Sequence, residues 1–93
     1  MKFNYAEEKN RYAVKNEAGE EIGEITWSNA GEDVMIVDHT YVNPDYRGNK
    51  IAQQLVFQAA EVARRDDKKI IPLCPFAKKE FETKPEYQDV WRR

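Results

Sequence analysis

The stretch VNPDYRGNKIAQQLVFQAA, residues Val42–Ala60, joins an apolar run to a long helical pattern. Proline stands second in its opening turn, Asn43-Pro44-Asp45-Tyr46, which is a favoured position for proline in a turn. From Ile51 onwards, apolar residues recur at spacings of one, three and four, as they do on one face of an amphipathic helix. The pattern predicts a helix over about residues 49–65, where the apolar spacing stops.

Strands are predicted on both sides of this helix. The segment VMIVDHTYV, Val34–Val42, is rich in β-branched and aromatic residues, and KIIPLC, Lys69–Cys74, contains a short apolar strand at 69–73. A strand–helix–strand unit places its two strands parallel, with a right-handed crossover. The first half of Val34–Val42 is apolar on both faces, so we expect this strand in the interior of the sheet.

The N-terminal third of the chain predicts an antiparallel meander. Residues 3–16 contain two short strand candidates, and EIGEITWS, Glu21–Ser28, alternates in the manner of a further strand, with short turns between them. Beyond the last strand, residues 75–91 predict one or two short helices, the second starting near Pro85. The expected fold class is therefore α/β or α+β, with a mixed, mostly antiparallel sheet and one long helix packed across it.

Two residues near the last strand predict an opening in the sheet. Pro72 lies inside the strand and has no N–H for a ladder, so we expect the pairing of this strand to fail beyond it. Cys74 precedes Pro75, and proline is favoured at the first position of a helix. Cys74 would then cap that helix, where the pKa of a thiol is lowered. It would share one rim of the sheet with the turn at 47–52.

Size and composition limit the classes of function. Ninety-three residues fit one domain, which we expect to span 1–93 as a monomer or weak homodimer. The formal net charge of −2 does not favour nucleic acid or a membrane as a partner. One cysteine and one histidine exclude an intrachain disulfide and do not favour a metal site. Signal-peptide and transmembrane patterns are absent from the sequence, so a cytoplasmic location is expected.

The basic turn Arg47–Lys50 has two interpretations. A helix N-terminus offers unpaired N–H groups and a positive dipole end, Gly48 allows close approach of the backbone, and the two basic side chains add charge. Together these features favour phosphate binding. The alternative is an ordinary strand-to-helix turn with solvated side chains. The sequence matches neither the P-loop motif nor the dinucleotide motif with three glycines.

The segment YRGNKIA, Tyr46–Ala52, resembles the acetyl-CoA pyrophosphate loop of the GNAT superfamily of N-acetyltransferases, which commonly reads Arg/Gln-x-x-Gly-x-Gly/Ala. Arg47 and Ala52 match the first and last positions, and Lys50 stands where the central glycine is usual. In a longer frame, DHTYVNPDYRGNKIAQQLV and IIPLCPFAKKEFETKPEY resemble a minimal GNAT-like family of roughly 90-residue proteins, shorter than ordinary domains. This resemblance covers about residues 33–90.

The resemblance implies a pared-down GNAT fold that binds acetyl-CoA as co-substrate, with no metal. It places Cys74 near the thioester, as a proton donor or as a nucleophile that carries the acetyl group. It places His39 beside the cofactor, where it could take a proton from the amine. Both residues also have a purely structural interpretation, as a buried small hydrophobe and a strand histidine. The residues implied for cofactor binding are Tyr41, Val42, Arg47, Gly48, Asn49, Lys50, Ile51, Ala52, Cys74 and Phe76.

The sequence thus predicts an acetyl-CoA-dependent N-acetyltransferase that acts on an unidentified amine. The alternative is a non-catalytic module that binds acyl-CoA or another anion, because the chain is short and the central glycine of the loop is replaced by Lys50. A third interpretation is an adaptor that binds a partner through the C-terminal aromatic residues, and this one predicts no binding of CoA.

Overall fold

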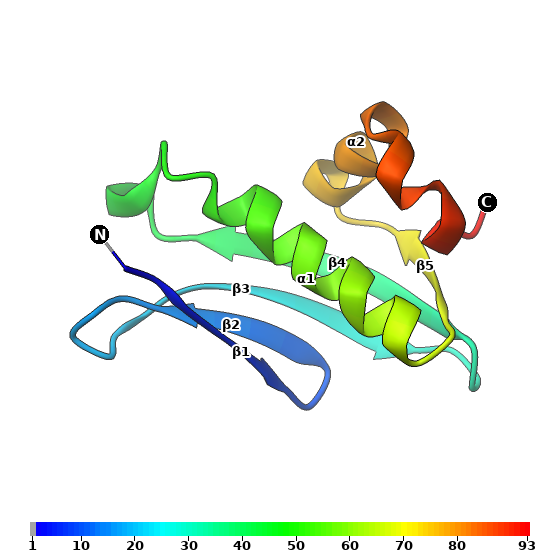
Figure 1. Ribbon diagram of the computed structural model, residues 1–93, viewed down its shortest axis with the longest axis horizontal. Coiled ribbons are helices and arrows are strands. Elements are labelled where there is room, and N and C mark those ends of the chain that lie inside the picture. The colour runs from blue at the N-terminus through cyan, green and yellow to red at the C-terminus, as the bar shows by residue number, and fades with distance from the viewer. Residues whose placement is uncertain (1) are drawn as a thin grey trace.

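The strand–helix–strand unit forms the middle of the fold in the computed structural model, which describes residues 2–93 (Figure 1). Strand β4 (Val34–Val42) leads through a short connection to helix α1 (Ile51–Arg65), and the chain returns in strand β5 (Lys69–Pro72). β4 and β5 pair in parallel, as this connectivity requires. The predicted helix and its two parallel strands are confirmed.

Three strands precede this unit: β1 (Asn4–Glu8), β2 (Arg11–Lys15) and β3 (Glu21–Asn29). The sheet has five strands in the order β1-β2-β3-β4-β5, so strands that are neighbours in sequence are also neighbours in space. The first three pairs are antiparallel and the β4–β5 pair is parallel. The predicted α+β class, with a mixed and mostly antiparallel sheet, is confirmed.

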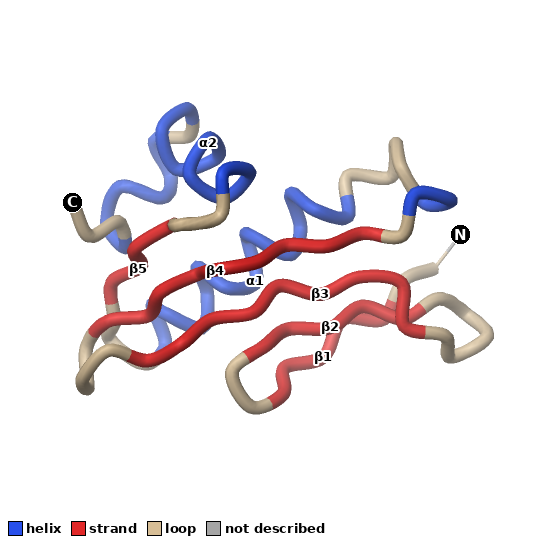
Figure 2. The backbone as a smooth tube through the Cα atoms, turned by 180° about the vertical axis from the view of Figure 1, so that it is seen from behind, coloured by secondary structure: helices blue, strands red, loops and turns tan. Residues whose placement is uncertain are grey.

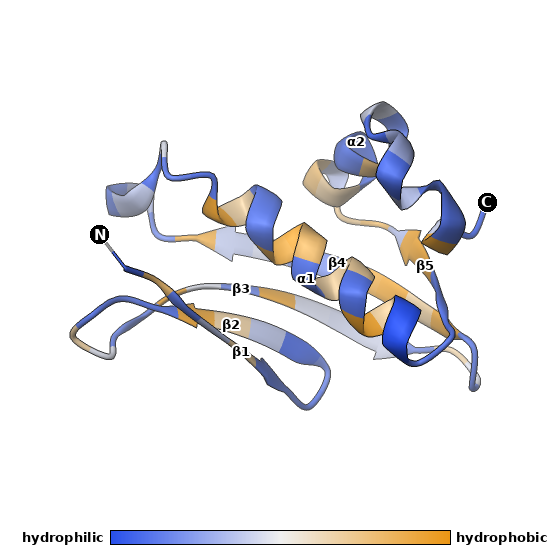
Figure 3. Ribbon diagram, in the orientation of Figure 1, coloured by the Kyte–Doolittle hydropathy of each residue, from blue (hydrophilic) through white to orange (hydrophobic). Residues whose placement is uncertain are grey.

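Helix α1 covers one face of the sheet, and its apolar stripe forms the centre of the core (Figure 1). Leu55 and Val56 of α1 are buried together with Ile25 of β3 and Met35 of β4. Figure 3 shows the hydrophobic colours on α1, β4 and β5, where these elements lie together. Burial of each large apolar side chain contributes about 1.5–3 kcal/mol, so the packing of α1 on the sheet supplies a large share of the stability.

Two short helices complete the chain: α2 (Pro75–Thr83) and the 3-10 helix η2 (Pro85–Val90). The ring of Phe81 stacks on Tyr87 with a centroid distance of 5.0 Å, and it meets Trp91 edge-on at 6.1 Å. Trp91 forms an isolated bridge with β5, so the C-terminal segment shields the outer edge of this strand. The predicted short helices are confirmed, including the start at Pro85.

The sheet opens between β4 and β5, because their pairing stops halfway along β4. The last pair joins Val37 to Pro72, although β4 continues to Val42. Pro72 has no N–H, and the next two N–H groups, of Leu73 and Cys74, both donate to the carbonyl of Val37, at 2.9 and 3.1 Å. The predicted failure of pairing beyond Pro72 is confirmed.

A β-bulge lies at the same point of β4, on the side of β3. Thr26 pairs with His39 and Trp27 with Val37, which leaves Asp38 between the two pairs without a partner in this ladder. A bulge bends a strand and changes the direction of its side chains. Beyond Asp38, the alternation of side chains along β4 is therefore shifted by one residue relative to the first half of the strand.

The helices occupy only one side of the sheet. Figure 2 shows the strands in front of α1, with α2 at the β5 edge and no helix over the face that is turned to the viewer. Within residues 2–93, none of the helices combines the length and the apolar composition that crossing a bilayer requires.

Candidate functional site

The connection from β4 to α1 has a backbone that suits close approach of a ligand. It contains the 3-10 helix η1 (Pro44–Tyr46), followed by the basic turn. Gly48 and Lys50 both adopt left-handed conformations, with φ of 88° and 58°. Glycine enters this region freely, whereas for Lys50 it costs roughly 1–2 kcal/mol. Lys50 is also the N-cap of α1, so the unpaired N–H groups of the first helical turn follow it directly.

A cavity of about 120 Å³ lies at this helix N-terminus. Pockets that enclose drug-sized ligands have volumes of about 300–1,000 Å³, so this cavity can enclose only part of a ligand as large as CoA. Tyr46 and Gln53 also line this cavity, although they were not predicted as site residues. Their positions directly before and directly after the motif Arg47–Ala52 could have identified them. The other lining residues are predicted cofactor residues: Val42, Arg47, Gly48, Lys50, Ile51 and Ala52.

Side chains within the connection hold its shape. Asn49 donates from Nδ2 to the carbonyl of Tyr46 at 2.9 Å, and Asn43 accepts the N–H of Asp45 at 2.9 Å. The amide of Asn49, predicted to bind the cofactor, is thus engaged inside the turn and does not line the cavity. The exposed basic side chains of this turn are those of Arg47 and Lys50.

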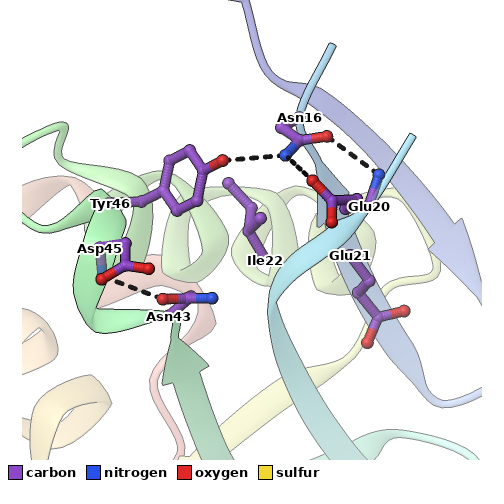
Figure 4. A pocket seen from close by; sticks show the side chains of 7 residues that line it. All are labelled: Asn16, Glu20, Glu21, Ile22, Asn43, Asp45 and Tyr46. Atoms are coloured by element: carbon purple, nitrogen blue, oxygen red, sulfur yellow. Dashed lines mark hydrogen bonds between the residues drawn. The ribbon is translucent and has the colours of Figure 1, made fainter. Parts of the chain in front are cut away.

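The buried amide of Asn16 fixes η1 against the turn between β2 and β3. Its Nδ2 donates to Tyr46 Oη at 2.9 Å and to Glu20 Oε1 at 3.0 Å, and its Oδ1 accepts the N–H groups of Ala18 and Glu20. Tyr46 lines both the first cavity and a second one, so Asn16 positions a wall of the predicted cofactor site. The second cavity, of about 170 Å³, is lined by Asn16, Glu20, Glu21, Ile22, Asn43, Asp45 and Tyr46 (Figure 4).

Cys74 is buried at the N-cap of α2, the position that was predicted from the sequence. Its Sγ lies 3.5 Å from Oγ1 of Thr40 on β4. Burial raises the pKa of the thiol, but the Thr40 hydroxyl and the N–H groups of Ala77, Phe76 and Thr40 outweigh this effect, so the pKa lies below its ordinary value. Donors from two elements therefore stabilise the thiolate, as they do at reactive cysteines.

His39 and Tyr41 point to the face of the sheet opposite Cys74. Thr40 contacts Cys74, and neighbouring side chains along a strand point to opposite faces. The His39 side chain is 53% exposed, its Nε2 lies 3.8 Å from Oε2 of Glu24, and its ring stacks on Tyr41. The two predicted catalytic residues thus lie on either side of β4. Tyr41, predicted to bind the cofactor, can offer only its backbone to a ligand on the Cys74 side.

The unpaired edge of β4 provides a backbone donor at the opening. The N–H of Asn43 donates to the carbonyl of Ile22 on β3 at 2.7 Å. The N–H of Val42, one residue earlier, therefore points to the other edge, beyond the end of β5. Phe76, the remaining predicted cofactor residue, lies partly buried against the core beside Cys74. Among residues 2–93, no three side chains of His, Cys, Asp or Glu are grouped to hold a metal ion.

The chain matches known proteins in sequence and in fold. The family model described as GCN5-related N-acetyl-transferase matches residues 11–90. A GCN5-like protein from Staphylococcus aureus, solved by NMR, is 29% identical and aligns with a TM-score of 0.77 over 96% of this chain and 87% of that chain. No curated protein matches this chain in sequence.

Two larger structures share the fold. A ribosomal-protein-alanine N-acetyltransferase from Brucella melitensis biovar Abortus 2308 aligns with a TM-score of 0.63 at 24% identity, over 81% of this chain and 63% of that chain. A GNAT family acetyltransferase from Elizabethkingia anophelis, with acetyl-CoA bound, aligns with a TM-score of 0.60 at 17% identity, over 67% of this chain and 40% of that chain. The chain spans less than two thirds of the length of either structure.

Proposed function

We propose that this chain, which belongs to the GCN5-related N-acetyl-transferase family, binds acetyl-CoA at the N-terminus of α1 and transfers the acetyl group to an amine. One observation carries the proposal. The left-handed turn at Gly48 and Lys50 exposes the first turn of α1 beside a cavity, and Val42, at the end of the unpaired half of β4, lines the same cavity. An anion site and an open strand edge thus adjoin each other.

The residues at this helix N-terminus fit a pyrophosphate group. Its negative charge suits the N–H donors and the positive dipole end of α1, together with the exposed Arg47 and Lys50. The residues that line the cavity include no Asp or Glu. The second cavity is lined by Glu20, Glu21 and Asp45, so it does not suit an anion. The charge of the two cavities therefore favours the first as the cofactor site.

Groups of this chain can supply the polar functions that acetyl transfer needs. Bound acetyl-CoA would supply the acetyl thioester. The N–H of Val42 would donate to a carbonyl oxygen in the opening and stabilise negative charge there. His39 would take the proton that a protonated amine must lose, and Glu24, 3.8 Å away, would stabilise the imidazolium. These roles require the amine to approach from the exposed face of the sheet.

The lowered pKa of Cys74 favours one of its two possible roles. A thiol whose pKa is lowered is more often a thiolate, which favours a nucleophile over a proton donor. The Cys74 thiolate would take the acetyl group from acetyl-CoA, whose thioester bond would break with CoA leaving as its thiolate. The amine nitrogen would then attack the acetyl carbon and lose a proton, and the Cys74 sulfur would leave as thiolate again. Because His39 lies on the opposite face, this route requires the amine to reach Cys74 through the gap between β4 and β5.

A second candidate function is a non-catalytic module that binds acyl-CoA. The separation of Cys74 and His39 by β4 favours it, because the two predicted catalytic side chains do not meet on one face of the sheet. It shares the cofactor site with the enzyme and differs in turnover. Mass spectrometry after incubation with acetyl-CoA and a panel of amines distinguishes the two, because only the enzyme converts the amines.

Titration of the labelled protein with acetyl-CoA, followed by NMR, tests the shared cofactor site. We expect the amide signals of residues 41–52 and 72–76 to shift. An Arg47→Ser/Lys50→Ser variant should bind about tenfold or more weakly, because it loses charged donors to phosphate. Lys78→Ser/Lys79→Ser on α2 removes the same charge away from the cavity and should bind normally. Unshifted signals at millimolar acetyl-CoA would overturn the proposal.

A further inference from the structure

The two edges of the sheet differ in how far they are covered. At one edge the C-terminal segment lies along β5, where Trp91 bridges to Ile70 and the N–H of Arg92 donates to the carbonyl of Ile70 at 2.8 Å. At the other edge β1 pairs with β2 alone, and Figure 2 shows it as the outermost strand. Within residues 2–93, the outer side of β1 is therefore a row of backbone N–H and C=O groups without a partner strand. We call this row the free edge.

The free edge lacks several features that commonly prevent a strand from pairing with another chain. Such features include proline, lysine and β-bulges. The strand NYAEE contains neither proline nor lysine, and its register with β2 has no bulge. Glu7 carries a charge on the side of α1, but Arg65 neutralises this charge at a distance of 2.5 Å. β1 therefore remains able to accept a further strand.

The pairing of β1 and β2 decides which backbone groups point to the free edge. The carbonyl of Asn10 accepts the N–H of Trp27 on β3 at 3.0 Å, so the N–H of Arg11, in the same peptide plane, points to β1. Arg11 pairs with Glu8, whose backbone groups therefore point to β2. Because these directions alternate along a strand, every second residue points the other way. The residues whose backbone groups point to the free edge are Tyr5 and Glu7 within β1, with Phe3 directly before it.

Symmetry restricts how a second copy of this chain can pair with the free edge. A two-fold axis perpendicular to the sheet keeps α1 of both copies on the same face, so each residue opposes one that points to that same face. An axis centred on Tyr5 places the two Tyr5 residues opposite each other. The further pairs in this register, each formed twice, are Lys2 with Glu8, Phe3 with Glu7, and Asn4 with Ala6. An axis centred on Glu7 would instead oppose two carboxylates, and one centred on Ala6 would form no ion pair.

The charges around Glu8 favour the first of these registers. The Arg11 guanidinium donates at 2.8–2.9 Å to three carboxylates, those of Glu8, Glu21 and Glu24. One cation thus serves three anions within a single copy. Lys2 is exposed and forms no ion pair in the part of the chain that the structure describes. A second copy would bring its Lys2 opposite Glu8 and add a cation to this cluster.

We propose that the free edge binds the β1 strand of a second copy, antiparallel and centred on Tyr5, so that two five-stranded sheets join into one. On the side of α1, Phe3 and Tyr5 pack partly buried against the core, and a second strand would cover this rim further. The contact is shorter than a standard interface, so we expect dissociation in the high micromolar range. The inference goes beyond the proposed function and does not depend on it, because β1 does not line the cofactor cavity.

Sedimentation equilibrium of the full chain over a series of concentrations tests the inference. Lys2→Glu and Glu8→Lys each place like charges opposite each other, so either variant alone should dimerise about tenfold more weakly. An equimolar mixture of the two variants restores opposite charges in both pairs and should dimerise about as strongly as the unchanged chain. The control is Lys79→Glu, which makes the same change of charge on α2 at an exposed residue without an ion pair and should dimerise normally.

The amide spectrum of the labelled chain locates the contact. We expect the signals of residues 3–8 to move as the concentration rises, and to move less in Lys2→Glu. A chain that stays monomeric at about 1 mM would overturn the inference. Signals that move only in β5 and η2 would also overturn it, because the contact would then lie at the other edge. Equal dimerisation of Lys2→Glu, Lys79→Glu and the unchanged chain would exclude the register centred on Tyr5.

Discussion

At the scale of single residues, the Thr40 hydroxyl is one of the groups that lower the pKa of Cys74. Its hydroxyl oxygen lies 3.5 Å from Sγ and helps to lower the pKa of the thiol against the effect of burial. A Thr40→Val variant keeps the shape of the side chain and loses the donor, so the pKa of Cys74 should rise and the thiolate fraction at neutral pH should fall. The pH dependence of iodoacetamide alkylation, measured by mass spectrometry, should move to higher pH, with a several-fold slower reaction at neutral pH.

The control for this prediction lies on the same sheet. Thr26→Val makes the same chemical change, but the Thr26 hydroxyl bonds to Asp38 on the face of the sheet opposite α1, away from the sulfur. It should leave the alkylation profile unchanged. An unchanged profile in Thr40→Val would instead assign the lowered pKa to the backbone N–H groups alone.

Lys50 illustrates what a motif can and cannot show about a single residue. The motif comparison predicted glycine at this position and identified Lys50 as the departure from the pattern. The structure gives the physical reason for the usual glycine, because the backbone there has a φ of 58°. Lysine adopts this conformation at a cost of roughly 1–2 kcal/mol. That backbone angle follows from the whole connection between β4 and α1, and hydrophobic spacing does not reveal it.

At the scale of elements, Asn16 joins the β2–β3 turn to η1, which is far away in sequence. An Asn16→Ala variant leaves the N–H groups of Ala18 and Glu20 without their acceptor and frees the hydroxyl of Tyr46. The loss of these partly buried hydrogen bonds should lower the free energy of unfolding by about 1–3 kcal/mol, measured by urea denaturation. Acetyl-CoA binding should also weaken, because Tyr46 lines the cofactor cavity.

A second variant separates these two effects. Tyr46→Phe removes one of the hydrogen bonds and keeps the ring. It should therefore lower the free energy of unfolding by only about 1 kcal/mol and leave the cavity wall in place. Full stability of Asn16→Ala would show that solvent replaces the lost bonds, and the anchoring role of Asn16 would then be wrong.

The helices and strands could be predicted from the sequence, but the face of the sheet on which each site residue lies could not. Periodicity identified the long helix, and Pro72 and Pro75 located the end of β5 and the start of α2. These signals are local. The bulge at Asp38 is set by the register between β3 and β4, and it decides that His39 and Cys74 point to opposite faces. The bond from Asn16 to Tyr46 depends on the assembled fold in the same way.

At the scale of the whole molecule, the end of α1 connects the first and last parts of the chain. Arg65 pairs with Glu7 of β1 at 2.5 Å, and the neighbouring Arg64 pairs with Asp89 of η2 at 2.9 Å. Both arginines lie in the last helical turn, where a positive charge also interacts favourably with the helix dipole. Two adjacent side chains thus hold the N-terminal strand and the C-terminal segment against the central helix.

These two ion pairs should make the fold sensitive to acid. Hydrogen bonds from Arg65 and Arg64 hold the pKa of Glu7 and that of Asp89 below their ordinary values of 4.5 and 3.8. The stability that they contribute is therefore complete above those ordinary values and is lost as the pH falls through the lowered ones. We expect a Glu7→Gln/Asp89→Asn variant to lose less unfolding free energy on acidification than the unchanged chain, in urea denaturation at a series of pH values.

The control is Glu82→Gln, because Glu82 has no ion pair among residues 2–93. This variant should lose as much unfolding free energy on acidification as the unchanged chain does. Equal loss in all three proteins would show that these pairs contribute nothing to folding.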